Sequence, residues 1–570
     1  MLRTLFVSLA ALSLAGCATV APLEAPLAGQ DNAYLGNVSA ADPRAEQAGM
    51  EMLRRGGTAT DAAIAVMLAL TVVEPQSSGI GGGGFLVRGT REGAVSTYDG
   101  RETAPAAATP DWFLAEDGSL PPFGESVRSG LSVGVPGNVA LAAKAHADHG
   151  RLAWAELFGP AIRLAREGFR INPRLNQSLA ASRDRAGFTS LGRELFFDVT
   201  GEPRPVGDLV TNEALARTLE ELAADPARFY AGPDPENWSA AIAGATPHPA
   251  GMTARDFASY EAKLRDPVCR SYRAHRICAM GPPTSGGLAV LQMLGLLERF
   301  DLAALGVRNP ATWHLFVEAQ RLAYADRELY LADSDFVTVP VTGLLESGYL
   351  ARRSALIDPN AAMATVGPGS PEGAPRALAD GDEPEEQGTS HFAVIDGELT
   401  MVSYTSTIEG PFGSGLMVGG FYLNNELTDF SRSPTVDGRP VANRIEGGKR
   451  PRSSMSPVVV YDPQGQPLLA IGAAGGSTIP VQTARSIIGV IDFDLPLEKA
   501  LGLPFIMAFG DAVAVEQGTW LEGMIPALSA LGHTEVVARP AGLKSGGILR
   551  RGERWISARD PRIEAQVTLP

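Results

Sequence analysis

The sequence predicts an α+β fold in which helices and strands are interleaved. Up to about residue 358, amphipathic helical stretches are mixed with short strand-like runs, and the clearest helices are predicted over 61–73, 141–149, 160–168 and 311–331. Further along, residues 389–407 alternate and are rich in β-branched side chains, which predicts two strands around a turn near Asp396 and Gly397. Both patterns lie within one chain, so a purely helical or purely β fold is excluded.

The length, charge and composition of the chain limit what kinds of protein it can be. A chain of 570 residues allows three to five small domains or one large fused body. The formal net charge of -16 repels phosphate backbones, so we expect no nucleic-acid partner. Three cysteines and seven scattered histidines show no metal-ligand spacing; His146 and His149 share a predicted helix but lack a third ligand. We therefore expect neither a metal site nor a cofactor.

The N-terminus has the pattern of an export signal. Arg3 is followed by an apolar run over 5–12 that is too short to span a bilayer, and then by Leu14-Ala15-Gly16-Cys17. This tetrapeptide resembles a bacterial lipobox, in which the cysteine becomes the acylated first residue. We expect a signal peptide over 1–16, a lipid on Cys17 and a periplasm-facing lipoprotein of the outer membrane. An ordinary cleaved signal that contains a cysteine is the alternative.

Two cysteines remain for the exported part of the chain. Cys269 and Cys278 flank residues 271–276, which have the pattern of a hairpin tip. A disulfide across this hairpin is one possibility in an oxidising compartment, and two buried free thiols are the other.

Two short motifs are interpreted as structural. Gly79, Gly81 and Gly84 satisfy GxGxxG, but they follow a helix and precede a strand, the reverse of a nucleotide-binding loop. Residues 130–134 satisfy GxSxG, yet Pro136 stands where a helix should begin, so we expect a strand there and no nucleophile at Ser132.

The segment 366–388 is rich in proline, glycine and acidic residues and has almost no large apolar side chain, so we expect it to be exposed and mobile. Such a segment ordinarily links domains. The alternative is self-cleavage before Thr389, which would give Thr389 a free α-amine with a pKa of about 8 that can deprotonate its own hydroxyl. Gly388 suits this reaction because it leaves room beside its carbonyl. The predicted turn brings Thr405 or Thr407 opposite Thr389.

Long motifs in a fixed order carry a resemblance to a known family. From about residue 40 to 565 the chain resembles γ-glutamyltransferases (glutathione hydrolases), which are enzymes. The matching blocks are GGTATDAA (56–63), DGRETAP (99–105), TSH (389–391), TSTIE (405–409), NNELTDF (424–430), RPRSSMSP (450–457), GGS (475–477) and DPR (560–562).

This resemblance implies an N-terminal-nucleophile hydrolase: a four-layer αββα sandwich formed jointly by a large subunit (17–388) and a small subunit (389–570) cut from one precursor. It also implies roles for individual residues. Thr389 would be the nucleophile that accepts the γ-glutamyl group of glutathione and related compounds and passes it to water or an amine. The other implied site residues are Thr407 beside the nucleophile, Arg101, Ser453 and Ser454 for the donor carboxylate, Glu409, Glu426 and Asp429 for its ammonium, and Gly475 and Gly476 for the oxyanion.

The chemistry requires these residue types independently. A glutamyl α-carbon carries one anionic and one cationic group, which calls for a bidentate cation and, separately, carboxylates. In some family members the stretch corresponding to 431–448 is longer and carries an aromatic lid residue, whereas here it contains no Phe, Tyr or Trp. Lidless members shade into cephalosporin acylases with glutaryl donors, so that activity is the alternative, and Glu409 favours γ-glutamyl donors. An inactive lipid-anchored binding protein is the remote alternative.

Overall fold

A computed structural model describes residues 35–569, except 248–250, 376–377, 380 and 382–387. The predicted signal peptide and Cys17 lie outside the described residues. Within the described part of the chain, no helix combines the length and apolar character needed to cross a membrane.

The first of two large sheets has the strand order β1-β9-β10-β2-β3-β6 and is antiparallel throughout. The predicted turn near Asp396 is confirmed, because it joins the neighbouring strands β9 and β10 and pairs Ser390 with Ser406. The strands are β1 (Gly36–Ser39), β2 (Gly83–Gly89), β3 (Val95–Gly100), β6 (Lys263–Arg265), β9 (Ser390–Asp396) and β10 (Met401–Thr407).

The second sheet has the order β21-β20-β16-β15-β8-β7 and is also antiparallel. The predicted hairpin is formed by its edge strands, and Cys269 and Cys278 face each other there in a disulfide. The strands are β7 (Val268–Tyr272), β8 (His275–Ala279), β15 (Val458–Tyr461), β16 (Pro467–Gly472), β20 (Gly546–Arg551) and β21 (Arg554–Arg559).

The two sheets pack face to face through an apolar layer. Phe85, Ala393 and Ile395 from the first sheet meet Val459 and Ile548 from the second, and all five are fully buried. Alternate residues of each strand point into this layer, while the other residues point toward the helices.

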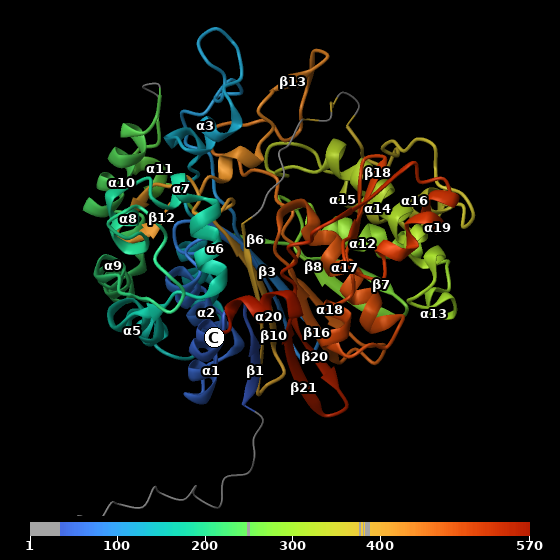
Figure 1. Cartoon of the computed structure of the whole chain (residues 1–570), viewed down its shortest axis with the longest axis horizontal. Coiled ribbons are helices and arrows are strands. Elements are labelled where there is room, and N and C mark those ends of the chain that lie inside the picture. Colours follow the sequence, from blue (N-terminus) through green and yellow to red (C-terminus); the bar gives the residue numbers. More distant parts are fainter. Residues whose placement is uncertain (1–34, 248–250, 376–377, 380, 382–387, 570) are drawn as a thin grey trace, which may run out of the picture. The chain divides into compact units, whose positions relative to one another are not determined.

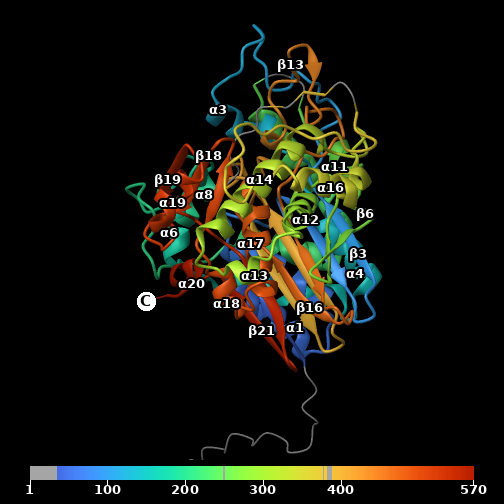
Figure 2. The same ribbon diagram turned by 90° about the vertical axis from the view of Figure 1, so that its right-hand side faces the viewer.

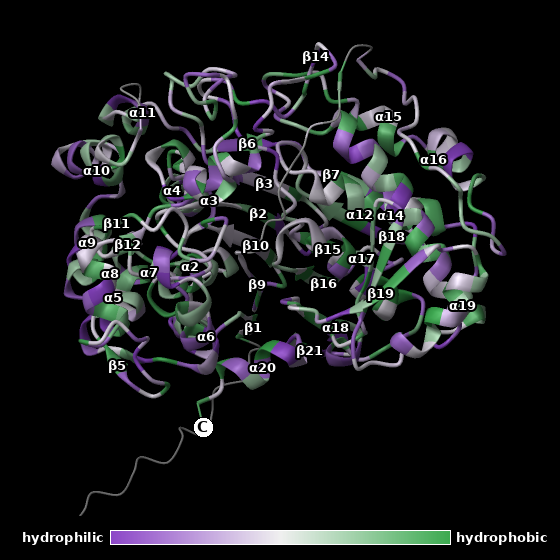
Figure 3. Ribbon diagram, turned by 45° about the horizontal axis from the view of Figure 1, so that its top comes forward, coloured by the Kyte–Doolittle hydropathy of each residue, from purple (hydrophilic) through white to green (hydrophobic). Residues whose placement is uncertain are grey.

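Helices cover the outer face of each sheet, which confirms the predicted αββα sandwich (Figures 1 and 2). The four predicted helices are confirmed within a few residues. Helix α12 is buried along its whole length and strongly hydrophobic (Figure 3). The main helices are α1 (Pro43–Arg54), α2 (Ala59–Val73), α4 (Asn138–His149), α5 (Gly159–Glu167) and α9 (Glu213–Ala224) on the first sheet, and α12 (Gly286–Leu297), α14 (Pro310–Tyr330), α16 (Ser347–Ser354), α17 (Ile479–Ile491) and α18 (Leu497–Leu501) on the second.

Shorter elements complete the described fold. A further sheet joins β17 (Ile506–Phe509), β18 (Ala512–Glu516) and β19 (Glu535–Arg539). The remaining helices are α3 (Phe123–Val127), α6 (Pro173–Ala181), α7 (Arg183–Ala186), α8 (Ser190–Phe196), α10 (Pro233–Gly244), α11 (Ala254–Ala258), α13 (Leu302–Leu305), α15 (Val341–Leu345), α19 (Ile525–Ala530) and α20 (Pro561–Val567). Two-residue strands form the pairs β4 (Phe169–Arg170) with β5 (Leu209–Val210), β11 (Met417–Val418) with β12 (Phe421–Tyr422), and β13 (Thr435–Val436) with β14 (Arg439–Pro440).

Two local predictions differ from the structure. The strand expected over 130–134 is wrong, because Gly130–Ser132 forms a 3-10 turn and Val135 makes only an isolated bridge to Thr103. The segment 366–388 is irregular over its described residues, as predicted, but it is not exposed throughout. The Gly369 N–H donates to the Asp326 carboxylate at 2.7 Å, and Gly388 is buried.

Candidate active site

Thr389 lies immediately before β9, the second strand of the first sheet, and is 3% exposed. Its hydroxyl contacts the carbonyl oxygen of Gly388 and donates to the Thr407 hydroxyl at 3.2 Å. The Thr407 oxygen also accepts the Glu409 N–H at 2.8 Å and lies 3.5 Å from the Gly388 oxygen. Two hydroxyls therefore converge on the peptide bond before Thr389, and the structure brings together these two predicted catalytic residues.

Position 388 has no room for a side chain, so it requires glycine. A Cβ atom at this position would lie 1.9 Å from the carbonyl oxygen of Glu409, far inside contact distance. Glu409 itself has a φ of 67°, a left-handed conformation that non-glycine residues rarely adopt. The backbone of Glu409 therefore lies tightly against the peptide bond before Thr389, and only glycine fits beneath it.

Arg101 and the two predicted carboxylates form one buried ion cluster. Its guanidinium is 1% exposed and pairs with Glu426 through Nη1 and with Asp429 through Nη2. The guanidinium also donates to the carbonyl oxygens of Pro451 at 3.1 Å and Arg452 at 3.0 Å. We expected the cation and the carboxylates to bind the donor separately, and the structure instead places them in direct contact because both carboxylates lie on one short 3-10 turn, Glu426–Asp429.

Glu102 was not predicted and adds a third carboxylate to this cluster. Its Oε2 lies 3.8 Å from Arg101 Nη1, and its side chain is fully buried. Burial raises the pKa of Glu102 to about 7, although the positive charge of Arg101 lowers it. The cluster can therefore take up or release a proton near neutral pH.

A continuous series of contacts joins this cluster to the predicted nucleophile, Thr389. Glu409 contacts the Nδ2 group of Asn425, the residue before Glu426, and the Gly410 N–H donates to Asn425 Oδ1 at 2.9 Å. Arg185 lies close to the same turn, since a Cβ on Gly410 would lie 2.4 Å from its Nη1. Burial lowers the pKa of Arg185 while the charge of Glu409 raises it. Sequence reasoning missed Arg185.

The two predicted serines directly follow Arg452, whose carbonyl oxygen accepts from Arg101. Ser454 Oγ accepts from Arg327 Nη2 at 2.8 Å, so its own proton remains available for another acceptor. Ser453 Oγ accepts the Met455 N–H at 3.1 Å. Arg327 belongs to α14 and was not predicted. A second guanidinium therefore orients Ser454.

The Gly475–Gly476 turn lies at the Thr389 end of β9. Both glycines have positive φ values, 125° and 59°. The N–H and the hydroxyl of Thr478 both donate to the carbonyl oxygen of Gly475. Gly472, three residues earlier, touches the ring of His391, since a Cβ there would lie 2.5 Å from it. These conformations allow consecutive N–H groups to point to one side, as an oxyanion site requires.

A further buried group of charges supports the residue after the nucleophile. Ser390 Oγ donates to Glu74 at 2.6 Å, and Glu74 pairs with Arg174 at 2.8 Å. Burial lowers the pKa of Lys544 to about 7; the charge of Arg174 adds to this effect, and that of Glu74 opposes it. This set was also not predicted, because its members are separated by hundreds of positions.

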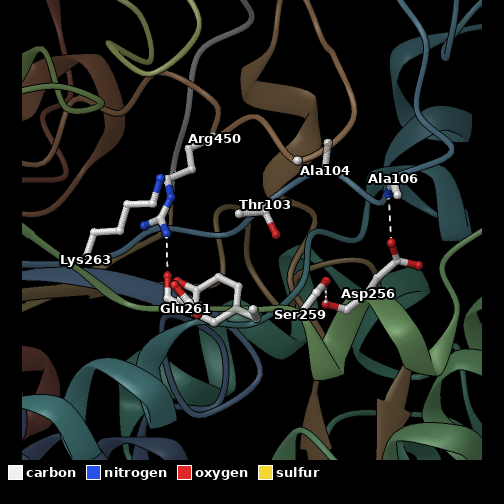
Figure 4. A pocket seen from close by; sticks show the side chains of 10 residues that line it. Thr103, Ala104, Ala106, Asp256, Ser259, Glu261, Lys263 and Arg450 are labelled. Atoms are coloured by element: carbon white, nitrogen blue, oxygen red, sulfur yellow. Dashed lines mark hydrogen bonds between the residues drawn. The ribbon is translucent and has the colours of Figure 1, made fainter.

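A pocket of about 210 Å³ is lined by Thr103, Asp256, Tyr260 and Arg450 among others (Figure 4). The Tyr260 hydroxyl donates to the Arg101 carbonyl oxygen at 2.8 Å. No predicted site residue lines this pocket, so it is distinct from the cluster around Thr389. Its link to that cluster is Tyr260, which holds the Arg101 backbone.

Comparison with known proteins identifies the family. Residues 45–569 match the family model described as Gamma-glutamyltranspeptidase. The glutathione hydrolase proenzyme of Bacillus subtilis (strain 168) is 36% identical over 481 residues, covering 83% of this chain and 80% of that protein. The corresponding Escherichia coli (strain K12) proenzyme is 34% identical over 544 residues, covering 94% and 91%. The acylase ACY 1 proenzyme of Pseudomonas sp. (strain SE83) is 32% identical over 510 residues, covering 87% and 86%.

Comparison with solved structures points to the same kinds of protein. The cephalosporin acylase of Bacillus halodurans superposes with a TM-score of 0.80 at 27% identity, covering 95% of this chain and 97% of that one. The Helicobacter pylori gamma-glutamyltranspeptidase superposes with a TM-score of 0.56 at 36% identity, covering 59% and 95%. The chain is an enzyme with the N-terminal-nucleophile hydrolase fold, and it belongs to the gamma-glutamyltranspeptidase family.

Proposed function

We propose that this protein is a glutathione hydrolase and γ-glutamyltransferase that cleaves its own chain before Thr389 and then uses Thr389 as its nucleophile. The observation that carries the proposal is the position of the Thr389 hydroxyl, which contacts the Gly388 carbonyl on one side and the Thr407 hydroxyl on the other. Proenzymes among the relatives support a processed precursor.

The first reaction converts the peptide bond into an ester. Thr389 Oγ attacks the carbonyl carbon of Gly388, the C–N bond breaks, and the released nitrogen takes the hydroxyl proton to become the α-amine of Thr389. The Thr407 hydroxyl, 3.5 Å from the Gly388 oxygen, can donate to the negative charge that forms there. Water then hydrolyses the ester, which leaves a Gly388 carboxylate and a free Thr389 hydroxyl.

The second reaction is turnover of the donor. The ammonium of a γ-glutamyl donor pairs with Glu409, Glu426 and Asp429, and its carboxylate pairs with Arg101 and the Ser453–Ser454 hydroxyls. A zwitterion of this shape inserts into the buried ion cluster and exchanges partners with it, so no charge is left unpaired. The Thr389 amine takes the hydroxyl proton as Oγ attacks the γ-carbonyl, and the N–H groups of Gly475 and Gly476 bind the oxyanion.

The acyl group then leaves the enzyme. The Thr389 ammonium gives its proton to the departing amine, and a water molecule or a second amine attacks the γ-glutamyl ester. Either acceptor restores the Thr389 hydroxyl. No cofactor takes part in this scheme.

Cephalosporin acylase activity is the second candidate. It is favoured by the superposition on the Bacillus halodurans acylase and by the absence of aromatic residues over 431–448. Glu409 favours the γ-glutamyl donor, because a glutaryl group has no ammonium to pair with it. Comparison of γ-glutamyl and glutaryl anilides as donors separates the two activities.

We also propose that the enzyme is exported and held on the periplasmic side of the outer membrane by a lipid on Cys17. The lipobox-like sequence before Cys17 supports this location. A Cys17→Ala protein should leave the membrane fraction, since each buried CH₂ group of the lipid contributes about 0.8 kcal/mol to anchoring. Unchanged partitioning of this variant would contradict the anchor.

Denaturing electrophoresis with N-terminal sequencing tests the central proposal. Wild type should give two fragments, the smaller beginning at Thr389. Thr389→Ala should remain full length and inactive, whereas Thr389→Ser, which keeps the hydroxyl, should still be cleaved. A smaller fragment that begins elsewhere, or cleavage of Thr389→Ala at the same bond, would refute the assignment of the nucleophile.

A further inference from the structure

Two imidazoles and one carboxylate meet in the core beside the second sheet, far from the site described above. His314 and Glu318 are four positions apart on α14 and therefore lie on one face of that helix. His533 comes from the loop between α19 and β19. All three side chains are buried, and one ligand atom from each lies within 4.8 Å of the other two.

The hydrogen bonds of His314 fix which of its nitrogens carries the proton. Its Nε2 lies 2.8 Å from the carbonyl oxygen of Asp358, which can only accept, so Nε2 carries the hydrogen. Nδ1 is then an unprotonated lone pair, and it lies 2.8 Å from His533 Nε2. A backbone carbonyl that holds one imidazole nitrogen while the other is left as a ligand is the arrangement found behind metal-bound histidines.

Glu318 is oriented in a similar way. One of its oxygens accepts from Arg321 Nη1 at 2.9 Å and the other accepts the Met363 N–H at 2.7 Å. Each oxygen keeps a second lone pair. Arg321 also donates to Asp511 at 2.6 Å, so its positive charge is shared between two carboxylates.

We propose that His314 Nδ1, His533 Nε2 and Glu318 bind a zinc ion. Two neutral imidazoles and a carboxylate are a donor set that suits Zn²⁺, and they leave a fourth position for a water molecule. Zinc ligands lie about 3.3 Å apart around a tetrahedral ion with bonds of about 2.0 to 2.2 Å, so the two imidazoles separate by about half an ångström on binding. His533 moves its proton from Nε2 to Nδ1 as the metal binds.

This site revises the expectation that the chain binds no metal. The sequence contained one signal, the pair His314 and Glu318 on a predicted helix. His533 stands 219 positions further along, and nothing in its surroundings in the sequence points to the pair.

The zinc would act on stability and not on catalysis. Arg327 lies thirteen positions after His314 on α14, a distance of about 20 Å along a helix. The ligands also come from both sides of Thr389. If the chain is cleaved as proposed above, the ion clamps the two fragments together; binding of the ion itself does not depend on cleavage.

The test uses untagged full-length protein, stripped with a chelator and titrated with ZnCl₂, with bound zinc measured by mass spectrometry after dialysis. The variants are Glu318→Gln and His533→Ala. The matched control is His149→Ala, which removes a half-buried histidine from a helix that carries a second one, His146. Unfolding temperatures are recorded with and without zinc.

We expect about one zinc per chain in wild type and in the control, with an unfolding temperature that rises on zinc addition. Both ligand variants should bind zinc at least about tenfold more weakly and show no such rise. Zinc bound by none of the proteins, or equally by all four, would overturn the proposal. If a variant fails to fold, wild-type protein loaded with Co²⁺ in place of Zn²⁺ tests the proposal by itself. Absence of the visible absorption of four-coordinate Co²⁺ would then overturn the proposed site.

Discussion

Replacing Gly388 with alanine should stop self-cleavage almost completely. The added Cβ would lie 1.9 Å from the Glu409 carbonyl oxygen, whereas ordinary contacts begin at 3.4 Å, so one of the two backbones must move by about 1.5 Å. Glu409 is the residue whose N–H donates to Thr407 at 2.8 Å, and Thr407 in turn accepts from Thr389. A shift of either backbone therefore misaligns the nucleophile and its partner together.

A misplacement of about 1 Å can cost about 100-fold in rate, so we expect cleavage of Gly388→Ala to be at least that much slower. The assay follows loss of the full-length band with time in freshly purified precursor. Gly367→Ala is the matched control: it changes a glycine in the same acidic segment, and a Cβ there would meet no atom within 4 Å. If Gly388→Ala is cleaved as fast as this control, a side chain at position 388 does not misalign Thr389 and the prediction is wrong.

Three other predictions concern binding and stability. Arg101→Lys loses the fork that contacts both Glu426 and Asp429, so kcat/KM for a γ-glutamyl anilide should fall roughly 10- to 100-fold, and a change of less than about twofold would contradict its role. Glu409→Ala should lower kcat/KM for that donor and spare a glutaryl anilide; equal losses on both would favour the acylase. Burial lowers the pKa of His391 to about 3, well below its value of about 6.5 in the unfolded chain. As the pH drops below 6.5, the unfolded chain therefore binds a proton on this ring before the folded protein does. The free energy of unfolding falls through this interval as a result. Chemical unfolding should show a loss of about 1.4 kcal/mol per pH unit below 6.5 that is absent in His391→Asn, and an unchanged slope in that variant would contradict the assignment.

The proximity of Thr389 and Thr407 could be predicted because it depends on local geometry. A turn near Asp396 fixes which residues of the two strands lie opposite each other, and the structure pairs Ser390 with Ser406, which leaves Thr407 beside Thr389. The other predicted orienting residue, Thr405, instead contacts the His391 ring at 2.9 Å. An error of two positions in the turn would have exchanged these roles.

The remaining site residues depend on contacts between distant segments. Arg327 and Arg185 lie on helices, and nothing in the neighbouring sequence shows that these helices reach Ser454 and the turn after Glu409. Arginine is also the common cation of this chain, so a single one attracts no attention. The strand wrongly expected near residue 132 failed for a related reason: its polar groups are bonded by side chains, including the Ser132 hydroxyl on the Val127 carbonyl oxygen at 2.7 Å.

If the chain is cleaved as proposed, the order of strands determines how the two fragments can be handled afterwards. In the first sheet β9 and β10 lie between β1 and β2, so removal of the smaller fragment would expose two unpaired strand edges inside what had been one sheet. Bare edges of this kind pair with other chains and aggregate. The fragments produced separately should therefore be insoluble, and mixing them should not restore the enzyme. Any reconstitution, labelling or segment exchange has to begin from the uncut precursor, with the cut made last.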